Sequence, residues 1–141
     1  MTKWLLRGGR VVDPANGRDG VFDVLIDNAD RWTGNNTKSS VDRRTLYFMD
    51  NTLSFSLFTL GHETNLTPLH RIAVFPRRLV TRLRLLTFDT ITKALESAGD
   101  PLAPLLNPDE IRALLQRRDH IIAYVDDLSH MYGEAKVLAL P

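Results

Sequence analysis

The sequence predicts an α+β domain that is mostly α-helical, with a short β segment at its N-terminus. Residues 1–27 hold short apolar runs separated by glycine and Asn-Gly turn signals, which favours strands. After Pro76, apolar residues recur at helical spacing between recognisable caps. The 141 residues, 43% of them apolar, are enough for one domain with a buried core.

Composition excludes several classes of function. The chain has no cysteine, so disulfides, thiolate nucleophiles and cysteine-rich zinc sites are excluded. A net charge of +1 gives no whole-chain argument for binding nucleic acid or acidic membranes. No apolar run approaches the ~18–20 residues of a membrane span, and no signal peptide is recognisable. We therefore expect a cytoplasmic protein without a membrane partner, and give no weight to the glycosylation sequons that begin at Asn35 and Asn65.

The N-terminal segment favours strands and turns. "KWLLRGGRVVDP" has two short apolar runs split by Gly8-Gly9, and "ANGRDG" is typical of a turn because Asn-Gly supplies positive φ. "VFDVLID" at 21–27 alternates apolar and acidic residues, which favours a half-buried strand. The last turns of a helix remain the open alternative for this short stretch.

The middle of the chain is less regular. Residues 28–44 are polar and indicate a loop, whereas "TLYFM" at 45–49 is a candidate for a buried strand. "NTLSFSLFTLGHETNLTPLH", which follows at 51–70, mixes polar and apolar residues without a period and predicts irregular structure.

Helices are predicted after Pro76. "RRLVTRLRLL" carries apolar residues at 79, 80, 83 and 86, and Thr87 is a plausible cap for "FDTITKALESAG", which ends at Gly99. The clearest helix begins after Asn107 as cap, has Pro108 at its first position and ends at Gly133. Its predicted buried face consists of Ile111, Leu114, Leu115, Ile121, Ile122, Val125 and Leu128.

Residues 8–26, "GGRVVDPANGRDGVFDVLI", resemble the start of a dihydroorotase or a related cyclic amidohydrolase. In that family the segment forms edge strands of a small β-subdomain. The four histidines, at 62, 70, 120 and 130, never fall two apart, so the metal-binding His-x-His of the family is missing. The resemblance implies ancestry or gene fusion without hydrolase chemistry.

From about residue 22 the chain resembles atypical kinases of the Golgi casein kinase and four-jointed type, including their bacterial relatives. "FDVLIDNADRWTGNN" and "LYFMDNTLSF" are similar to their catalytic-loop and metal-loop region, and "LNPDEIRALLQRRD" fits a kinase C-terminal lobe. The resemblance implies a partial, kinase-like C-terminal lobe over 22–141, preceded by a dihydroorotase-like segment over 1–21. "FDVLI" fits both patterns, which indicates a chimeric front.

The kinase resemblance implies named roles for four residues. Phosphoryl transfer needs an aspartate to accept the proton of the attacking hydroxyl and oxygen ligands that hold Mg²⁺ against the phosphates of ATP. Asp30 and Asn35 have the five-residue separation of a kinase catalytic loop, and Asp50 follows the apolar "LYFM". We therefore assign catalysis to Asp30 and metal binding to Asn35 and Asp50, with Asn36 as a close competitor for the amide ligand.

Two further residues have supporting roles in this assignment, and a simpler structural alternative stays open. Asn28 would hydrogen-bond the loop backbone and Phe55 would pack beneath the metal loop. An Asn-rich loop is more often a simple turn. The segment before Asp30 is too short for a glycine-rich loop and a strand lysine, so we expect little activity unless a protein partner supplies or replaces that lobe.

Two further hypotheses and one surface complete the sequence-based expectations. The chain is alternatively a non-catalytic helical module that binds a partner, or an accessory fragment derived from an amidohydrolase. Five arginines lie close together without an acidic neighbour, and a solvated surface is favoured over nucleic-acid binding. They are Arg71, Arg77, Arg78, Arg82 and Arg84.

Overall fold

The computed structural model describes residues 20–28, 37–39, 46–48, 53–101 and 104–140, and most of them are helical. This confirms the expectation of a mostly α, kinase-like partial lobe. The elements are α1 (Gly20–Ile26), β1 (Thr37–Ser39), β2 (Leu46–Phe48), α2 (Glu63–Leu69), α3 (Arg77–Leu85), α4 (Phe88–Ser97), α5 (Pro108–Tyr132) and α6 (Glu134–Val137).

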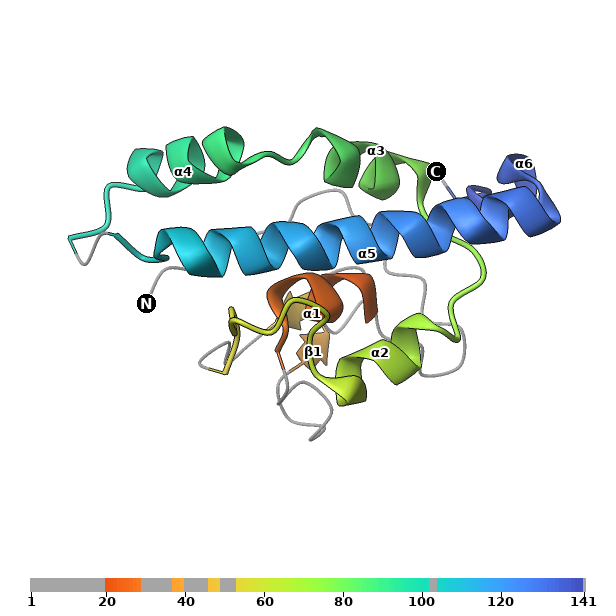
Figure 1. Ribbon diagram of the computed structural model, residues 1–141, viewed down its shortest axis with the longest axis horizontal. Coiled ribbons are helices and arrows are strands. Elements are labelled where there is room, and N and C mark those ends of the chain that lie inside the picture. Colours follow the sequence, from red (N-terminus) through yellow and green to blue (C-terminus); the bar gives the residue numbers. More distant parts are fainter. Residues whose placement is uncertain (1–19, 29–36, 40–45, 49–52, 102–103, 141) are drawn as a thin grey trace.

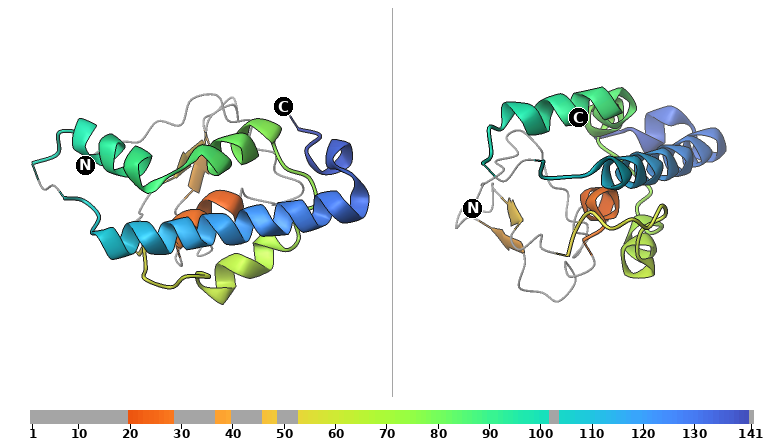
Figure 2. Two further views of the ribbon diagram at one scale, coloured as in Figure 1. Left: turned by 45° about the horizontal axis from the view of Figure 1, so that its top comes forward. Right: turned by 60° about the vertical axis from the view of Figure 1, so that its left-hand side comes forward.

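The long helix α5 forms the axis of the molecule (Figure 1). Helices α3 and α4 lie along one side of it, and α1 lies against the other side with α2 packed on α1. Two turned views show the same arrangement, with α6 beside the C-terminal end of α5 (Figure 2). None of the helices in the described ranges combines the length and apolarity needed to cross a membrane.

The core lies on both sides of α5. Five of the seven residues predicted for its apolar face are buried, while Leu115 and Ile122 are half-buried. Each full burial of such a side chain contributes roughly 1.5–3 kcal/mol. The buried cluster joins five helices and the segment before α3, through Val21, Val24, Leu69, Phe75, Val80, Leu83, Ile121, Val125, Leu128 and Val137.

The helix ends follow the caps that the sequence predicts. The side chain of Thr87 accepts a hydrogen bond from the backbone N–H of Thr90 at 3.2 Å. Asn107 accepts from the N–H groups of Asp109 and Glu110 at 2.9 and 3.0 Å, and the Glu110 carboxylate accepts from the N–H of Asn107 at 2.7 Å. These bonds satisfy donors that a helix start otherwise leaves unpaired.

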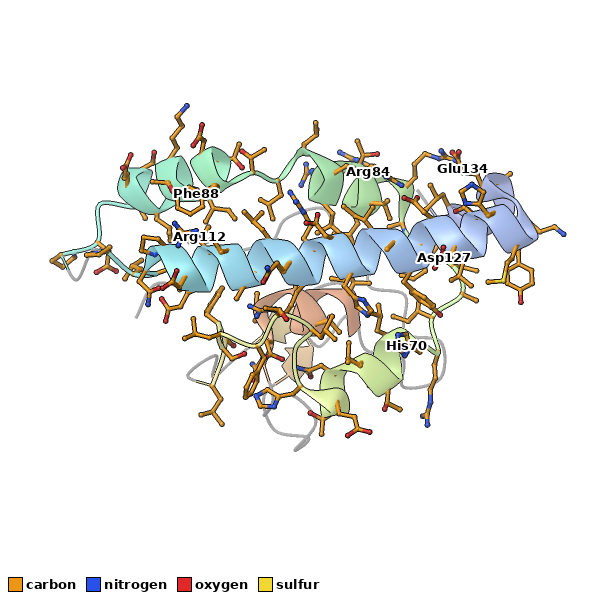
Figure 3. The ribbon with its side chains drawn as sticks, in the orientation of Figure 1. His70, Arg84, Phe88, Arg112, Asp127 and Glu134 are labelled. Atoms are coloured by element: carbon orange, nitrogen blue, oxygen red, sulfur yellow. The ribbon has the colours of Figure 1, made fainter. Side chains whose placement is uncertain are left out.

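Surface pairs tie α3 and α4 to the rest of the molecule (Figure 3). Arg84 of α3 pairs with Asp126 of α5, and the guanidinium of Arg112 lies over the ring of Phe88 at 5.9 Å from its centroid. All five arginines of the predicted basic surface are exposed. Exposed ion pairs of this kind contribute at most about 1 kcal/mol each.

The stretch 21–27 is helical, so the expectation of a half-buried strand is wrong and the helical alternative is confirmed. Val21 and Val24 are buried three residues apart, which is the spacing of one helix face. Asp27 follows with a φ of +53° and ends α1 in the left-handed conformation that Asp tolerates better than most residues. Residues 1–19 of the predicted N-terminal β segment lie outside the described ranges, so that part stays a prediction. The domain boundary at 21–22 falls within α1 and also stays a prediction.

Two other segments differ from expectation. The segment predicted to be irregular contains α2, in which Asn65 and Leu69 are buried one turn apart despite Pro68 inside the helix. The polar stretch predicted to be a loop contributes β1, which pairs antiparallel with β2. The predicted strand at 45–49 is confirmed over Leu46–Phe48.

Candidate active site

The four residues assigned to catalysis and metal binding, Asp30, Asn35, Asn36 and Asp50, lie outside the described residues. Their assignment therefore stays a prediction. The structure does describe the chain that leads to them and away from them: the end of α1, the hairpin of β1 and β2, and the segment from Leu53 onward.

The hairpin sets which ends of its strands are neighbours. Thr37 pairs with Phe48 and Ser39 pairs with Leu46 in an antiparallel register. The N-terminal end of β1 and the C-terminal end of β2 therefore lie side by side. In sequence, Asn36 directly precedes Thr37, and Asp50 is the second residue after Phe48.

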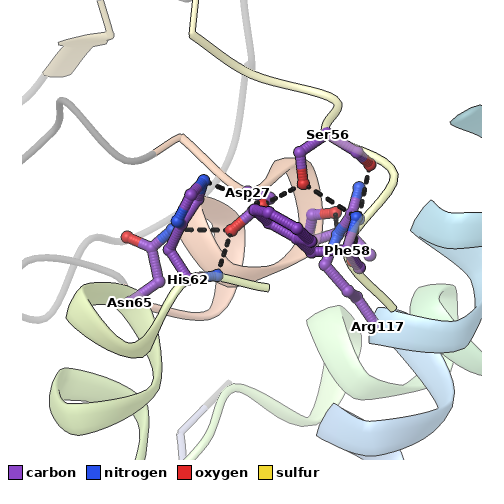
Figure 4. Close-up of polar contacts among 7 residues, drawn as sticks. Asp27, Ser56, Phe58, His62, Asn65 and Arg117 are labelled. Atoms are coloured by element: carbon purple, nitrogen blue, oxygen red, sulfur yellow. Dashed lines mark hydrogen bonds and ion pairs between the residues drawn. The ribbon is translucent and has the colours of Figure 1, made fainter. Parts of the chain in front are cut away.

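A buried carboxylate directly after α1 organises the described part of this region (Figure 4). The Asp27 side chain is wholly buried, and its Oδ1 accepts hydrogen bonds from the backbone N–H of His62 at 2.7 Å and from Nδ2 of Asn65 at 3.1 Å. Its Oδ2 accepts from the hydroxyl of Ser56. We call Asp27, Ser56, His62, Asn65 and Arg117 the Asp27 cluster.

His62 adds a second contact to the same carboxylate. Its Nε2 lies 3.7 Å from Oδ2 of Asp27, close enough for an ion pair when the imidazole is protonated. The ring also meets Phe58 edge-on, with centroids 4.9 Å apart. Backbone and side chain of His62 thus both fix the start of α2 against Asp27.

Arg117 enters the cluster from α5 and is wholly buried. Its Nε donates to the carbonyl of Leu25 at 3.0 Å, and its Nη1 donates to the carbonyls of Ser56 and Phe58 at 3.0 and 2.6 Å. Burial lowers the pKa of Arg117, and the charge of Asp27 opposes this by raising it. The guanidinium stays charged in either case, since arginine does not lose its proton in proteins.

The backbone is strained where the cluster forms. Asp27 has a φ of +53° and Phe55 has a φ of +63°, and the N–H of Phe55 donates to the carbonyl of Ile26 at 2.5 Å. Gly61 has a φ of +84°, and a Cβ built on it would lie 2.9 Å from Oδ1 of Asp27. Such conformations persist only where the surroundings impose them, and they gather at functional sites.

The described residues do not themselves form a metal centre. No group of three or more His, Asp or Glu side chains that could hold an ion occurs among them. His70 is exposed, with its ring 5.1 Å from that of Tyr124 and 6.0 Å from that of His120. The carboxylate and amide oxygens assigned at 35, 36 and 50 are by contrast the oxygen ligands that Mg²⁺ prefers.

The sequence contained one signal for the Asp27 cluster that pattern reasoning missed. Arg117 lies on α5 three and four residues from Leu114 and Ile121, both buried, and thus interrupts the apolar face. An arginine at such a position is almost never buried without partners. Asp27 had no comparable local signal, because its partners lie 29 or more residues away in sequence.

Helices arranged around α5, with a hairpin and a strained carboxylate cluster on one side, are consistent with a kinase C-terminal lobe. The family model described as "Golgi casein kinase, C-terminal, Fam20" matches residues 7–137. The chain belongs to this family. The expected kinase resemblance is thereby confirmed at the level of the family.

Curated relatives include the "Glycosaminoglycan xylosylkinase" of Homo sapiens, which is 31% identical over 120 residues. The protein with the same name from Danio rerio is 28% identical over 120 residues. In both cases the alignment covers 84% of this chain and 29% of the relative. The chain thus spans less than a third of the length of these relatives.

The comparisons correct one expectation. A cytoplasmic location is contradicted, because the matched family is that of Golgi casein kinases and points to the secretory pathway. The glycosylation sequon at Asn65 does not fit the fold in any compartment, because this side chain is wholly buried and its Nδ2, the atom that would carry a glycan, donates to Asp27. None of the comparisons bears on the dihydroorotase-like segment, which stays a prediction.

Proposed function

We propose that this chain is a phosphotransferase lobe that binds a magnesium nucleotide through Asp30, Asn35 or Asn36, and Asp50. The observation that carries the proposal is the family match over 7–137, which includes all four positions. A truncated or chimeric origin is part of the same proposal. It is supported by the dihydroorotase-like stretch at residues 8–26, which precedes the kinase-like motifs.

The proposed roles follow from the chemistry of the side chains. The Asp30 carboxylate orients the acceptor hydroxyl and accepts its proton as the phosphoryl group is transferred. Oxygens of Asp50 and of Asn35 or Asn36 form a small, hard ligand set that fits Mg²⁺, which keeps several waters and binds few protein groups. Bound Mg²⁺ would neutralise charge on the nucleotide phosphates.

Two features of the described structure support this arrangement. The N-terminal end of β1 and the C-terminal end of β2 are neighbours, and in sequence Asn36 directly precedes the first and Asp50 is the second residue after the other. Asp27 precedes Asp30 by three residues and is fixed by hydrogen bonds to Ser56, His62 and Asn65. A fixed starting point is what a catalytic loop needs, because the reaction depends on positioning.

The names of the relatives support a sugar hydroxyl as the acceptor. Both are glycosaminoglycan xylosylkinases, whereas the family description names casein, a protein. We propose the sugar because both individually matched relatives carry it in their names. We expect little turnover from these residues alone, because the segment before Asp30 offers no glycine-rich loop and strand lysine of the kind that protein kinases use.

Calorimetric titration with ATP in the presence of Mg²⁺ tests the nucleotide site. Asp50→Asn should weaken magnesium-dependent binding about tenfold or more, because it removes a charged ligand. Asp127→Asn is the matched control, since Asp127 is exposed on α5 (Figure 3). Equal affinities of Asp50→Asn and wild type, or no binding by wild type, would contradict the proposal.

A second candidate function, binding of a protein partner, is favoured by an apolar loop. Leu53, Leu57, Phe58 and Leu60 are each between 55% and 62% exposed. Such a run is unusual on a soluble surface and is typical of an interaction site. A second copy of this chain is one such partner. If the protein self-associates through this loop, Phe58→Asp should lower the sedimentation coefficient at high protein concentration. A wild-type protein that stays monomeric at all concentrations would exclude self-association.

A further inference from the structure

We propose that Arg117 is a positioning residue, which holds the segment entering the catalytic loop and the segment leaving the metal loop in one fixed arrangement. This inference rests on the proposed function and deepens it. Arg117 lies on α5, far along the chain from both loops. It would act through the backbone to which it is bonded, without touching nucleotide or metal.

The hydrogen-bond partners of Arg117 show which segments it connects. All three hydrogen bonds of the guanidinium go to backbone carbonyls: one on Leu25 near the end of α1, and two on Ser56 and Phe58 in the loop after Asp50. The carbonyls in the last turn of a helix lack partners within the helix, and a cation there is favourable. Arg117 thus joins two segments that are also linked by the hydrogen bond from the N–H of Phe55 to the carbonyl of Ile26.

The two segments that Arg117 connects contain strained backbone. Asp27 and Phe55 both have positive φ and lie in these two segments, and Gly61 approaches the same carboxylate. Non-glycine residues in this region cost of order 1 kcal/mol or more each. Arg117 is a wholly buried cation whose burial the charge of Asp27 offsets only in part, and its three hydrogen bonds connect the two strained segments directly.

The planar shape of the Arg117 guanidinium suits this role. One planar guanidinium reaches carbonyls in two segments at once because its donors point in several fixed directions. A lysine ammonium at the same place would keep the charge but lose this fork. The comparison of arginine with lysine therefore separates positioning from charge.

The link to the site is short on both sides. Asp27 precedes Asp30 by three residues, and Leu53 follows Asp50 by three. A shift of the Asp27 cluster would therefore displace the described segments that border these two loops. Residues that orient metal ligands without touching the metal typically change metal affinity or activity by about 10–100-fold when substituted.

The experiment combines hydrogen exchange with nucleotide binding on the full chain. Arg117→Lys should speed amide exchange in peptides that cover Phe55 and His62, whose N–H groups donate within this arrangement, and leave α4 unchanged. It should weaken magnesium-dependent ATP binding about 10–100-fold. Arg112→Lys, an exposed substitution on the same helix, should change neither.

The outcomes distinguish the two proposals. If wild type binds ATP but Arg117→Lys leaves amide exchange or ATP affinity unchanged, the positioning role alone is overturned. Absence of binding by wild type would overturn the proposed function and this role with it. If Arg117→Lys does not fold, Asp27→Asn replaces it, because this variant keeps the shape of the side chain. Asp27→Asn must then show faster exchange in the same peptides and weaker ATP binding. Exchange and binding equal to wild type in Asp27→Asn would overturn the inference.

Discussion

Replacing Gly61 by alanine tests the geometry of the Asp27 cluster at a single atom. The added Cβ would lie 2.9 Å from Oδ1 of Asp27 and 3.3 Å from Cδ of Arg117. The first distance is shorter than real Cβ contacts, and the oxygen belongs to a side chain held by Ser56, His62 and Asn65. Either the hydrogen bonds or the backbone must therefore shift.

The loss in free energy of unfolding expected for Gly61→Ala has two parts. Alanine at positive φ costs about 1–2 kcal/mol in the folded state, and lower entropy of the unfolded chain returns about 0.4–1 kcal/mol of this. Forcing an extra methyl into a filled space costs a further ~1–3 kcal/mol. Gly61→Ala should therefore lower the free energy of unfolding by about 1–5 kcal/mol, a large share of the ~5–15 kcal/mol typical of a domain.

The chain supplies matched controls. Gly99 and Gly133 also have positive φ, of +60° and +90°, but a Cβ on either would meet nothing within 4 Å. Urea denaturation followed by circular dichroism should show Gly99→Ala and Gly133→Ala losing only the backbone part. Equal losses for Gly61→Ala and these controls would refute the close approach of Gly61 to Asp27.

Two further predictions concern stability. Asn107→Ala removes the two hydrogen bonds that the Asn107 side chain accepts and should cost about 1 kcal/mol in urea denaturation, whereas no loss would contradict the cap. Tyr124→Phe removes a hydroxyl that donates toward the carbonyls of His70 and Ile72, and should cost ~1 kcal/mol at neutral pH. Burial, and then the neighbouring Tyr132, raise the pKa of Tyr124, so its contribution is present below the usual tyrosine pKa of about 10 and is lost as pH rises through the higher folded value. Wild type should thus lose more stability than Tyr124→Phe in alkaline solution, and parallel pH profiles would contradict this.

The helical half of the fold was predictable because its signals are local. Thr87, Asn107 and Pro108 mark helix starts through side chains that act within one turn. The apolar face of α5 repeats often enough to identify the helix period. The short α1 gave too few residues to separate a strand from a helix, and only packing of Val21 and Val24 against the core decides between them.

The candidate site could be assigned from the sequence only as a motif. The roles of Asp30, Asn35 and Asp50 come from a resemblance, which supplies no geometry, and they stay predictions. The Asp27 cluster depends on contacts across long separations in sequence, such as the 92 residues between Leu25 and Arg117. Local patterns carry no information on which distant carbonyls a buried guanidinium will meet.

The central claim is that the side chains at 30, 35 or 36, and 50 meet around one divalent cation. Replacement of Mg²⁺ by paramagnetic Mn²⁺, followed through backbone amide resonances, tests this most directly. The proposal predicts strong broadening for residues 28–36 and 49–53 together, with α4 unaffected. Broadening of only one of these segments, or uniform broadening across the chain, would contradict it.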